Sequence, residues 1–87
     1  MALKITYHPR FARMFKKLPK EIQAKAALKE DLFRTNPFDP RLRTHKLHAA
    51  LAEYWGFWID NRNRIIFRFV SPEEVYFYKI GDHSIYG

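Results

Sequence analysis

The strongest pattern of apolar and polar positions lies in the second half of the chain. Residues 55–59 and 65–70 are runs of β-branched and aromatic residues, and the polar residues 60–63 separate them. The Asp and Asn side chains of that separator tolerate turn geometry. The pattern therefore predicts a β-hairpin, around which we expect the rest of the chain to be organised.

The second strand of this hairpin is predicted to have two different faces, because successive side chains of a strand point to opposite sides. One face consists of Ile65, Phe67 and Phe69, and the other of Arg64, Ile66 and Arg68. We expect the first face to be core and the second to carry guanidinium groups, which can bind phosphate oxygens in pairs. The alternative is a solvated face with cross-strand partners such as Asp60.

Two helices are predicted upstream of the hairpin. After a short alternating strand at residues 3–7, Pro9 suits the first turn of a helix. Apolar residues then follow at i, i+3, i+4 and i+7 up to Leu18, with basic residues mostly on the opposite side. Pro19 ends this helix, and residues 20–35 predict a second one, rich in good helix formers.

The remaining segments complete a small sheet. Residues 44–48 predict a strand, residues 49–53 are either a short helix or the tip of a loop, and residues 75–80 predict a last strand. We therefore predict a single α+β domain over residues 1–87, with two N-terminal helices packed on part of one face of a mainly antiparallel twisted sheet of four to five strands. The first strand joins the sheet through a helical crossover, which makes it a candidate for parallel pairing.

Charge and composition add information about the partner. Sixteen Lys and Arg against nine Asp and Glu give a net charge of +7, which favours a polyanionic partner such as nucleic acid or an acidic protein segment. The absence of cysteine excludes disulfides and thiolate metal sites. Because there is no apolar leader and no apolar run near the roughly 20 residues that span a bilayer, we expect a cytoplasmic protein that does not bind membranes.

Three segments carry side chains that could cleave RNA without a metal. The reaction needs a group that removes the 2′-OH proton, a cation on the phosphate, and a group that protonates the leaving 5′ oxygen. We expect strand pairing to bring together His45, Lys46, Arg64, Lys79, His83 and Tyr86. Further basic candidates for RNA contact are Arg43, Arg62 and Arg68. Taken singly, each of these residues also has an ordinary structural role.

Metal and triad chemistry are not predicted. His45 and His48 would lie on opposite faces of a strand, and no carboxylate cluster completes a coordination sphere. Asp82, His83 and Ser84 are adjacent, so they cannot converge as a hydrolase triad does. We therefore expect neither a metal nor another cofactor.

Four segments, in their order and spacing, resemble a known family. They are HPRFARMFKKLPKEIQAKA, NPFDPRLRTHKL, NRNRIIFRF and YKIGDHSIY, and together they resemble the RelE/ParE superfamily of bacterial toxin-antitoxin toxins. The resemblance implies two helices on an antiparallel sheet and an acidic antitoxin, with which the toxin would form a hetero-oligomer. RelE-like members are ribosome-dependent endoribonucleases that cut mRNA in the A site without a metal, by attack of the 2′-OH to leave a cyclic phosphate.

The resemblance also implies roles for individual residues. Arg64 resembles the family's phosphate-binding arginine, and His83 stands where catalytic members carry a histidine or an arginine. Tyr86 resembles a C-terminal aromatic residue used in some members. His45, with Lys46 beside it, is similar to a histidine that one branch uses as an acid or base, and which of the two histidines is the base stays open.

The sequence departs from the family pattern in two places. Ser84 stands where many relatives carry an acidic residue, and residues 48–52 lack the glycines that are often found there. The leading hypothesis is a ribonuclease toxin that inhibits translation. The alternatives are a ParE-like toxin that binds DNA gyrase without RNA chemistry, and a toxin-fold protein that acts only by binding. Gyrase-binding members generally lack the histidine and arginine pair, so Arg64 and His83 favour the ribonuclease.

Overall fold

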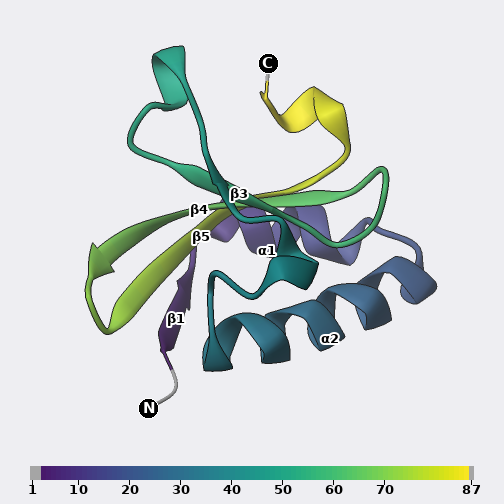
Figure 1. Cartoon of the computed structure of the whole chain (residues 1–87). Helices are drawn as coiled ribbons and strands as arrows, with labels where there is room; N and C mark the ends of the chain where they lie inside the picture. Colours follow the sequence, from purple (N-terminus) through teal and green to yellow (C-terminus); the bar gives the residue numbers. More distant parts are fainter. Residues whose placement is uncertain (1–2, 87) are drawn as a thin grey trace.

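The computed structural model describes residues 3–86, which form two α-helices and a five-stranded sheet (Figure 1). The helices are α1 (Pro9–Lys16) and α2 (Lys20–Thr35). The strands are β1 (Lys4–Tyr7), β2 (His45–Lys46), β3 (Trp55–Trp58), β4 (Arg64–Ser71) and β5 (Glu74–Gly81). Three short 3-10 helices are η1 (Pro40–Leu42), η2 (Ala49–Leu51) and η3 (His83–Tyr86).

The strands lie in the order β1-β5-β4-β3-β2. β1 pairs parallel with β5, and the other neighbouring pairs are antiparallel. The predicted fold class, the hairpin of β3 and β4, and the parallel pairing of the first strand are therefore confirmed. The strand expected at residues 44–48 is reduced to the two residues of β2, and the ambiguous residues 49–53 contain the short helix η2.

Local sequence explains where α1 begins and ends. The imidazole Nδ1 of His8 accepts a hydrogen bond from the backbone N–H of Arg10 at 2.9 Å and so caps the N-terminus of the helix. Pro9 occupies the first turn, where its missing N–H is not needed. The helix ends at Lys16, slightly before the predicted position, and the chain turns at Pro19 into α2.

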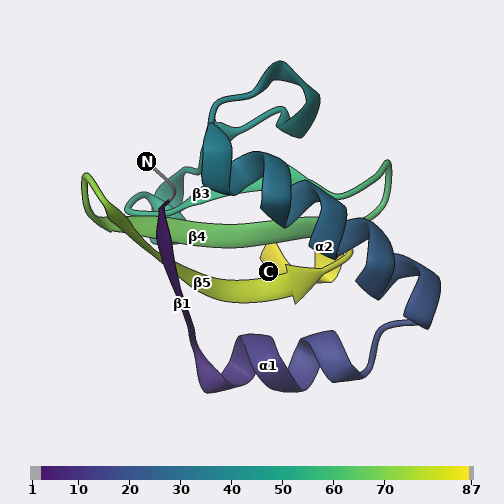
Figure 2. The same cartoon turned by 90° about the horizontal axis from the view of Figure 1, so that it is seen from below.

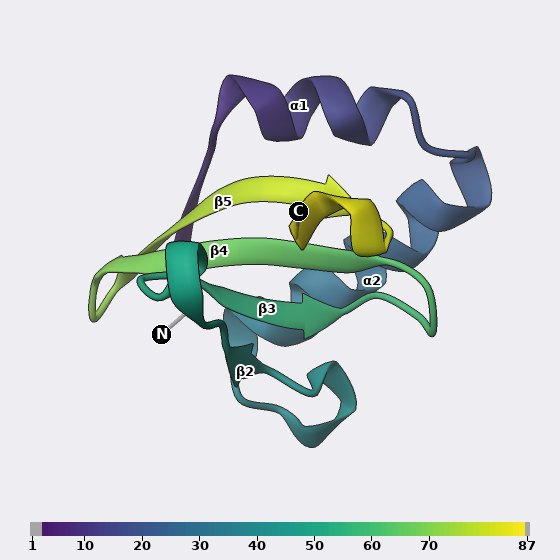
Figure 3. The ribbon, with the colours of Figure 1, turned by 90° about the horizontal axis from the view of Figure 1, so that it is seen from above.

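The two helices lie against different parts of the sheet. α2 crosses one face, whereas α1 lies along β5 at the edge of the sheet (Figures 2 and 3). β1 pairs only with residues 74–77 of β5, so α1 covers the remaining length of that strand. Phe11 of α1 also reaches the core between α2 and the sheet.

That core is built from aromatic side chains. The ring centroid of Phe33 on α2 lies 4.9 Å from that of Phe57, 4.8 Å from that of Phe67 and 5.4 Å from that of Phe77. All four side chains are fully buried, and such ring contacts add to the gain from burying large apolar surfaces. Phe33 therefore anchors α2 to the centre of the sheet.

The opposite face of the sheet carries a second, smaller apolar cluster. Leu47, Ile66 and Ile85 form it, with Met14, Leu51, Tyr54, Tyr78 and Tyr86 partly buried around them. Ile66 is fully buried and Arg64 is only 5% exposed. Arg64 lies on this face, as predicted, but it is buried, so the alternative of a solvated face is wrong at this position.

Gly81 allows the C-terminal segment to return over the sheet. Its φ of +154° is rarely adopted by residues with a side chain, and a Cβ at this position would lie 2.9 Å from Cγ2 of Ile85. Because glycine avoids both problems, Ile85 packs against the second cluster, and η3 lies above the sheet (Figure 3).

Candidate active site

Candidate residues lie in a row on this second face. His45 of β2 pairs with Gly56 of β3, Gly56 pairs with Ile66 of β4, and Ile66 pairs with Lys79 of β5. Paired residues share a face, so the four positions lie side by side across the sheet. With about 4.8 Å between neighbouring strands, His45 and Lys79 are roughly 14 Å apart and do not contact each other.

Gly56 is the centre of the site, although sequence reasoning gave it no role. A Cβ at Gly56 would lie 3.3 Å from the hydroxyl oxygen of Tyr86, 3.4 Å from Cε1 of His45 and 3.5 Å from Nε2 of His45. The missing side chain therefore lets a histidine and a tyrosine approach the same point above β3. A glycine inside a strand often marks such a close approach, and this rule could have identified the position.

His45 has its tautomer set by the backbone. Its Nδ1 lies 2.9 Å from the carbonyl oxygen of Arg43. A carbonyl can only accept, so Nδ1 carries the proton, and Nε2 of the neutral ring keeps its lone pair. Arg43 adopts a left-handed backbone conformation, with φ 52° and ψ 41°, at the end of η1. The nitrogen that can accept a proton is therefore the one that faces Gly56 and Tyr86.

Tyr86 presents a hydroxyl group that stays protonated at neutral pH. Its ring is partly buried against the second cluster, and burial raises the pKa of Tyr86 above its usual value, while the nearby charge of Arg64 acts in the opposite direction. The net effect is a raised pKa, so the group facing Gly56 is a proton donor. A transient negative charge on its oxygen would lie close to the Arg64 cation.

Arg64 is the buried charge of the site. Its Nη1 donates to the carbonyl oxygens of Asp60 and Asn63 at 2.6 Å and 3.1 Å, and its Nη2 donates to the carbonyl oxygen of Asn61 at 3.2 Å. Within residues 3–86 no carboxylate forms an ion pair with it. A buried guanidinium without a counter-ion is costly for stability, which points to a functional use of its charge.

The ring of Trp58 packs against the guanidinium group of Arg64. The guanidinium carbon of Arg64 lies 3.8 Å from the centre of the Trp58 ring, and that of Arg43 lies 4.4 Å from the same centre. Both are cation–π contacts. Trp58 is half-buried on the second face, so this ring holds two positive groups beside the point above Gly56.

The other predicted residues lie at the periphery or elsewhere. His83 is exposed, with its ring centroid 6.5 Å from that of Tyr86, and Nζ of Lys79 donates to the carbonyl oxygen of Ile85 at 3.4 Å. Lys46 follows His45 directly, so strand alternation points it to the other face. The structure therefore brings together His45, Tyr86 and Arg64. His83 and Lys79 lie at the border of this cluster, and Arg43 lies on Trp58. The remaining candidates, Lys46, Arg62 and Arg68, lie outside the cluster.

Metal binding depends on clusters of side chains, and spanning a membrane depends on helix length. Within residues 3–86 there is no group of three or more His, Cys, Asp or Glu side chains placed to hold a metal ion. Over the same residues, neither helix has the length and apolar character needed to cross a bilayer.

The element order and the sheet define the fold of RelE- and YoeB-type toxins, as comparison with solved structures shows. YafQ from E. coli strain BL21(DE3) is 17% identical with a TM-score of 0.80, covering 97% of each chain. A YoeB/ParE toxin from Agrobacterium tumefaciens is 15% identical with a TM-score of 0.77, covering 93% of this chain and 99% of that one. The E. coli DinJ-YafQ toxin-antitoxin complex matches with 16% identity and a TM-score of 0.77, over 98% of this chain and 97% of that one.

No protein-family model and no curated protein matches the sequence. The likeness to the solved structures therefore rests on shape, because the sequence identities are low. The fold that the motif resemblance implied is confirmed.

Proposed function

We propose that this chain is the toxin of a type II toxin-antitoxin module. We further propose that it cleaves mRNA at the site where His45 and Tyr86 approach Gly56. The observation that carries the proposal is the approach of His45 Nε2 and the Tyr86 hydroxyl to one point, with the Arg64 charge beside Tyr86. A proton acceptor, a proton donor and a buried cation are the three groups that RNA cleavage without a metal requires.

In this mechanism His45 is the general base. Nε2 removes the proton of a ribose 2′-OH, the 2′ oxygen forms a bond to phosphorus, and the bond from phosphorus to the 5′ oxygen breaks. Tyr86 gives its proton to the leaving 5′ oxygen, and the products are a cyclic phosphate and a free 5′-OH. The charge of Arg64 stabilises the Tyr86 phenolate until a proton returns from water.

The exposed cations act on the substrate outside this centre. His83 begins η3, with its ring centroid 6.5 Å from that of Tyr86, Nζ of Lys79 donates to the carbonyl oxygen of Ile85 in η3, and Arg43 lies on the Trp58 ring. We infer that they bind the phosphates of the flanking nucleotides.

The proposed partners are an acidic antitoxin and ribosome-bound mRNA. The net charge of +7 supports both, because each partner is anionic. The DinJ-YafQ structure has the same fold in a toxin-antitoxin complex, which supports the antitoxin. Cleavage on the ribosome would take place in the cytoplasm.

The test is an in vitro translation reaction in which the 5′ ends of the mRNA are mapped by primer extension. Wild-type protein should produce cuts that require ribosomes, and His45→Ala, Tyr86→Phe and Arg64→Ala should each reduce their rate strongly. His48→Ala is a matched control, because His48 is exposed and makes no side-chain capping bond to η2. Intact mRNA together with inhibition of gyrase supercoiling would overturn the proposal in favour of a ParE-like toxin.

A further inference from the structure

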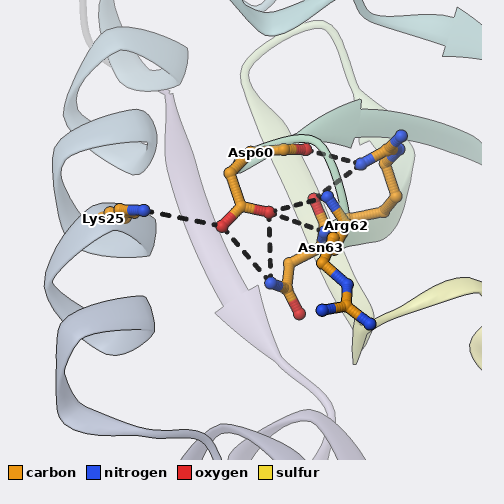
Figure 4. Close-up of polar contacts among 5 residues, drawn as sticks. Lys25, Asp60, Arg62 and Asn63 are labelled. Atoms are coloured by element: carbon orange, nitrogen blue, oxygen red, sulfur yellow. Dashed lines mark hydrogen bonds and ion pairs between the residues drawn. The ribbon is translucent and has the colours of Figure 1, made fainter.

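The loop between β3 and β4 is organised around the carboxylate of Asp60 (Figure 4). One oxygen, Oδ1, accepts hydrogen bonds from the backbone N–H groups of Arg62 at 2.9 Å and Asn63 at 2.8 Å, and from Nδ2 of Asn63 at 3.1 Å. The other oxygen lies 3.8 Å from Nζ of Lys25 on α2. Asp60 thus fixes the shape of the turn from inside.

The same turn holds the guanidinium of Arg64 by its backbone. Three N–H groups of Arg64 donate to the carbonyls of residues 60, 61 and 63. An arginine side chain has five N–H groups, so the Nε–H and one N–H of Nη2 have no acceptor within residues 3–86. Both Nη atoms donate to the loop, so the guanidinium edge formed by Nη1 and Nη2 faces the loop. The edge formed by Nε and Nη2 carries the two remaining N–H donors and points away from the loop. Two donors side by side match two phosphate oxygens.

We propose that Asp60 is a positioning residue, which fixes the carbonyls of the 60–63 turn and thereby the orientation of Arg64. This inference rests on the proposed function for its effect on RNA, but the positioning itself is a property of the folded chain. The carboxylate makes no contact with the guanidinium; only the backbone carbonyl of Asp60 does. Its effect on cleavage should therefore pass entirely through Arg64.

Two substitutions separate the hydrogen-bonding geometry of the Asp60 side chain from its charge. Asn has an oxygen at the position of Oδ1 and can accept the same backbone bonds, so Asp60→Asn keeps the turn and loses the charge. Asp60→Glu keeps the charge and moves the oxygens by one methylene. The Lys25 ion pair joins side chains that are 55% and 24% exposed, and pairs of this kind contribute little, so Lys25→Met serves as the control.

The first experiment measures ribosome-dependent cleavage rates for these variants. Asp60→Ala and Asp60→Glu should lower the rate about 10- to 100-fold, because small misplacements of a catalytic group cost that much. Asp60→Asn and Lys25→Met should stay within about 3-fold of wild type. In an Arg64→Ala background, Asp60→Ala should cause no further loss. Additive losses, or a rate for Asp60→Glu above that for Asp60→Asn, would overturn the proposal.

The second experiment does not depend on activity. In ¹H–¹⁵N spectra of wild type and Asp60→Asn, the Nη1–H of Arg64 that donates to the Asp60 carbonyl should give a dispersed, slowly exchanging resonance. The same resonance should move to the position of a free arginine in Asp60→Glu, whose dispersed amide spectrum reports that the fold is kept. If wild-type protein cuts no RNA, the proposed function fails. The comparison of the Arg64 resonance among wild type, Asp60→Asn and Asp60→Glu still tests whether Asp60 positions Arg64. An unchanged resonance in folded Asp60→Glu would refute it.

Discussion

The two faces of the sheet bury side chains in different ways. The face under α2 is filled by apolar groups, with Phe33 at its centre and three phenylalanines of the sheet around it. On the other face, the buried apolar cluster of the described residues is limited to Leu47, Ile66 and Ile85, and this face also holds Arg64, Gly56 and the half-buried Tyr86. The first face supplies the stability that the second face gives up by burying an unpaired charge.

The largest expected effect is on the α2 face. Phe33→Ala removes a fully buried ring with contacts to three others, and substitutions of this kind cost about 3–5 kcal/mol of unfolding free energy. We expect this variant to be largely unfolded, or to unfold at much lower urea concentration, when followed by circular dichroism.

Ile85→Ala is the matched substitution on the second face. It removes a buried side chain from a smaller cluster, so we expect a loss of about 2 kcal/mol, together with a lower cleavage rate, because η3 carries Tyr86. If Phe33→Ala and Ile85→Ala destabilised the protein equally, the proposed difference between the two faces would be wrong.

His45→Ala should have the next largest effect, on activity alone. Loss of a general base reduces a rate by about 10²- to 10⁴-fold, whereas His45 is exposed and its removal should leave the unfolding midpoint close to that of wild type. Cleavage and urea unfolding measured on the same preparation check this. A cleavage rate equal to that of His48→Ala would remove His45 from the mechanism.

Gly56→Ala should have an intermediate effect. The new Cβ would lie 3.3 Å from the Tyr86 hydroxyl, which has to shift by a few tenths of an ångström, and it would fill the space beside Cε1 of His45 at 3.4 Å. We expect the cleavage rate to fall about tenfold, because the two groups no longer converge on the same point. The unfolding midpoint, measured in parallel, should change little, and an unchanged rate would contradict the proposed centre.

The smallest expected effect concerns pH. Burial acts to raise the pKa of Asp60, but the backbone hydrogen bonds of Arg62 and Asn63 outweigh it and hold that pKa below its usual value. The ionised form is therefore favoured by folding, and its contribution to stability is present above about pH 4 and lost as the pH falls through the lowered pKa. The melting temperature of Asp60→Asn should approach that of wild type as the pH falls from 5 to 2. A constant difference over this range would show that the Asp60 charge does not stabilise the fold.

The sequence predicted the elements that depend on neighbours along the chain. The hairpin around Asp60 and the helix that begins at Pro9 have local causes, namely turn residues, a cap and apolar spacing. The burial of Arg64 could not be predicted in this way, because it depends on η3 returning over β4. The tautomer of His45 depends on a left-handed Arg43, a conformation that no residue pattern near it required.

The pairing of β1 with β5 has a consequence for the order of folding. Lys4 lies opposite Glu74, so the two strands come from positions almost the whole described chain apart, and such long-range contacts form slowly. During synthesis, β1 and α1 have no strand to pack against until β5 has emerged. Tyr86 follows β5 in the chain. Until both have been synthesised, the sheet is incomplete and the proton donor for the cleavage that we propose is missing.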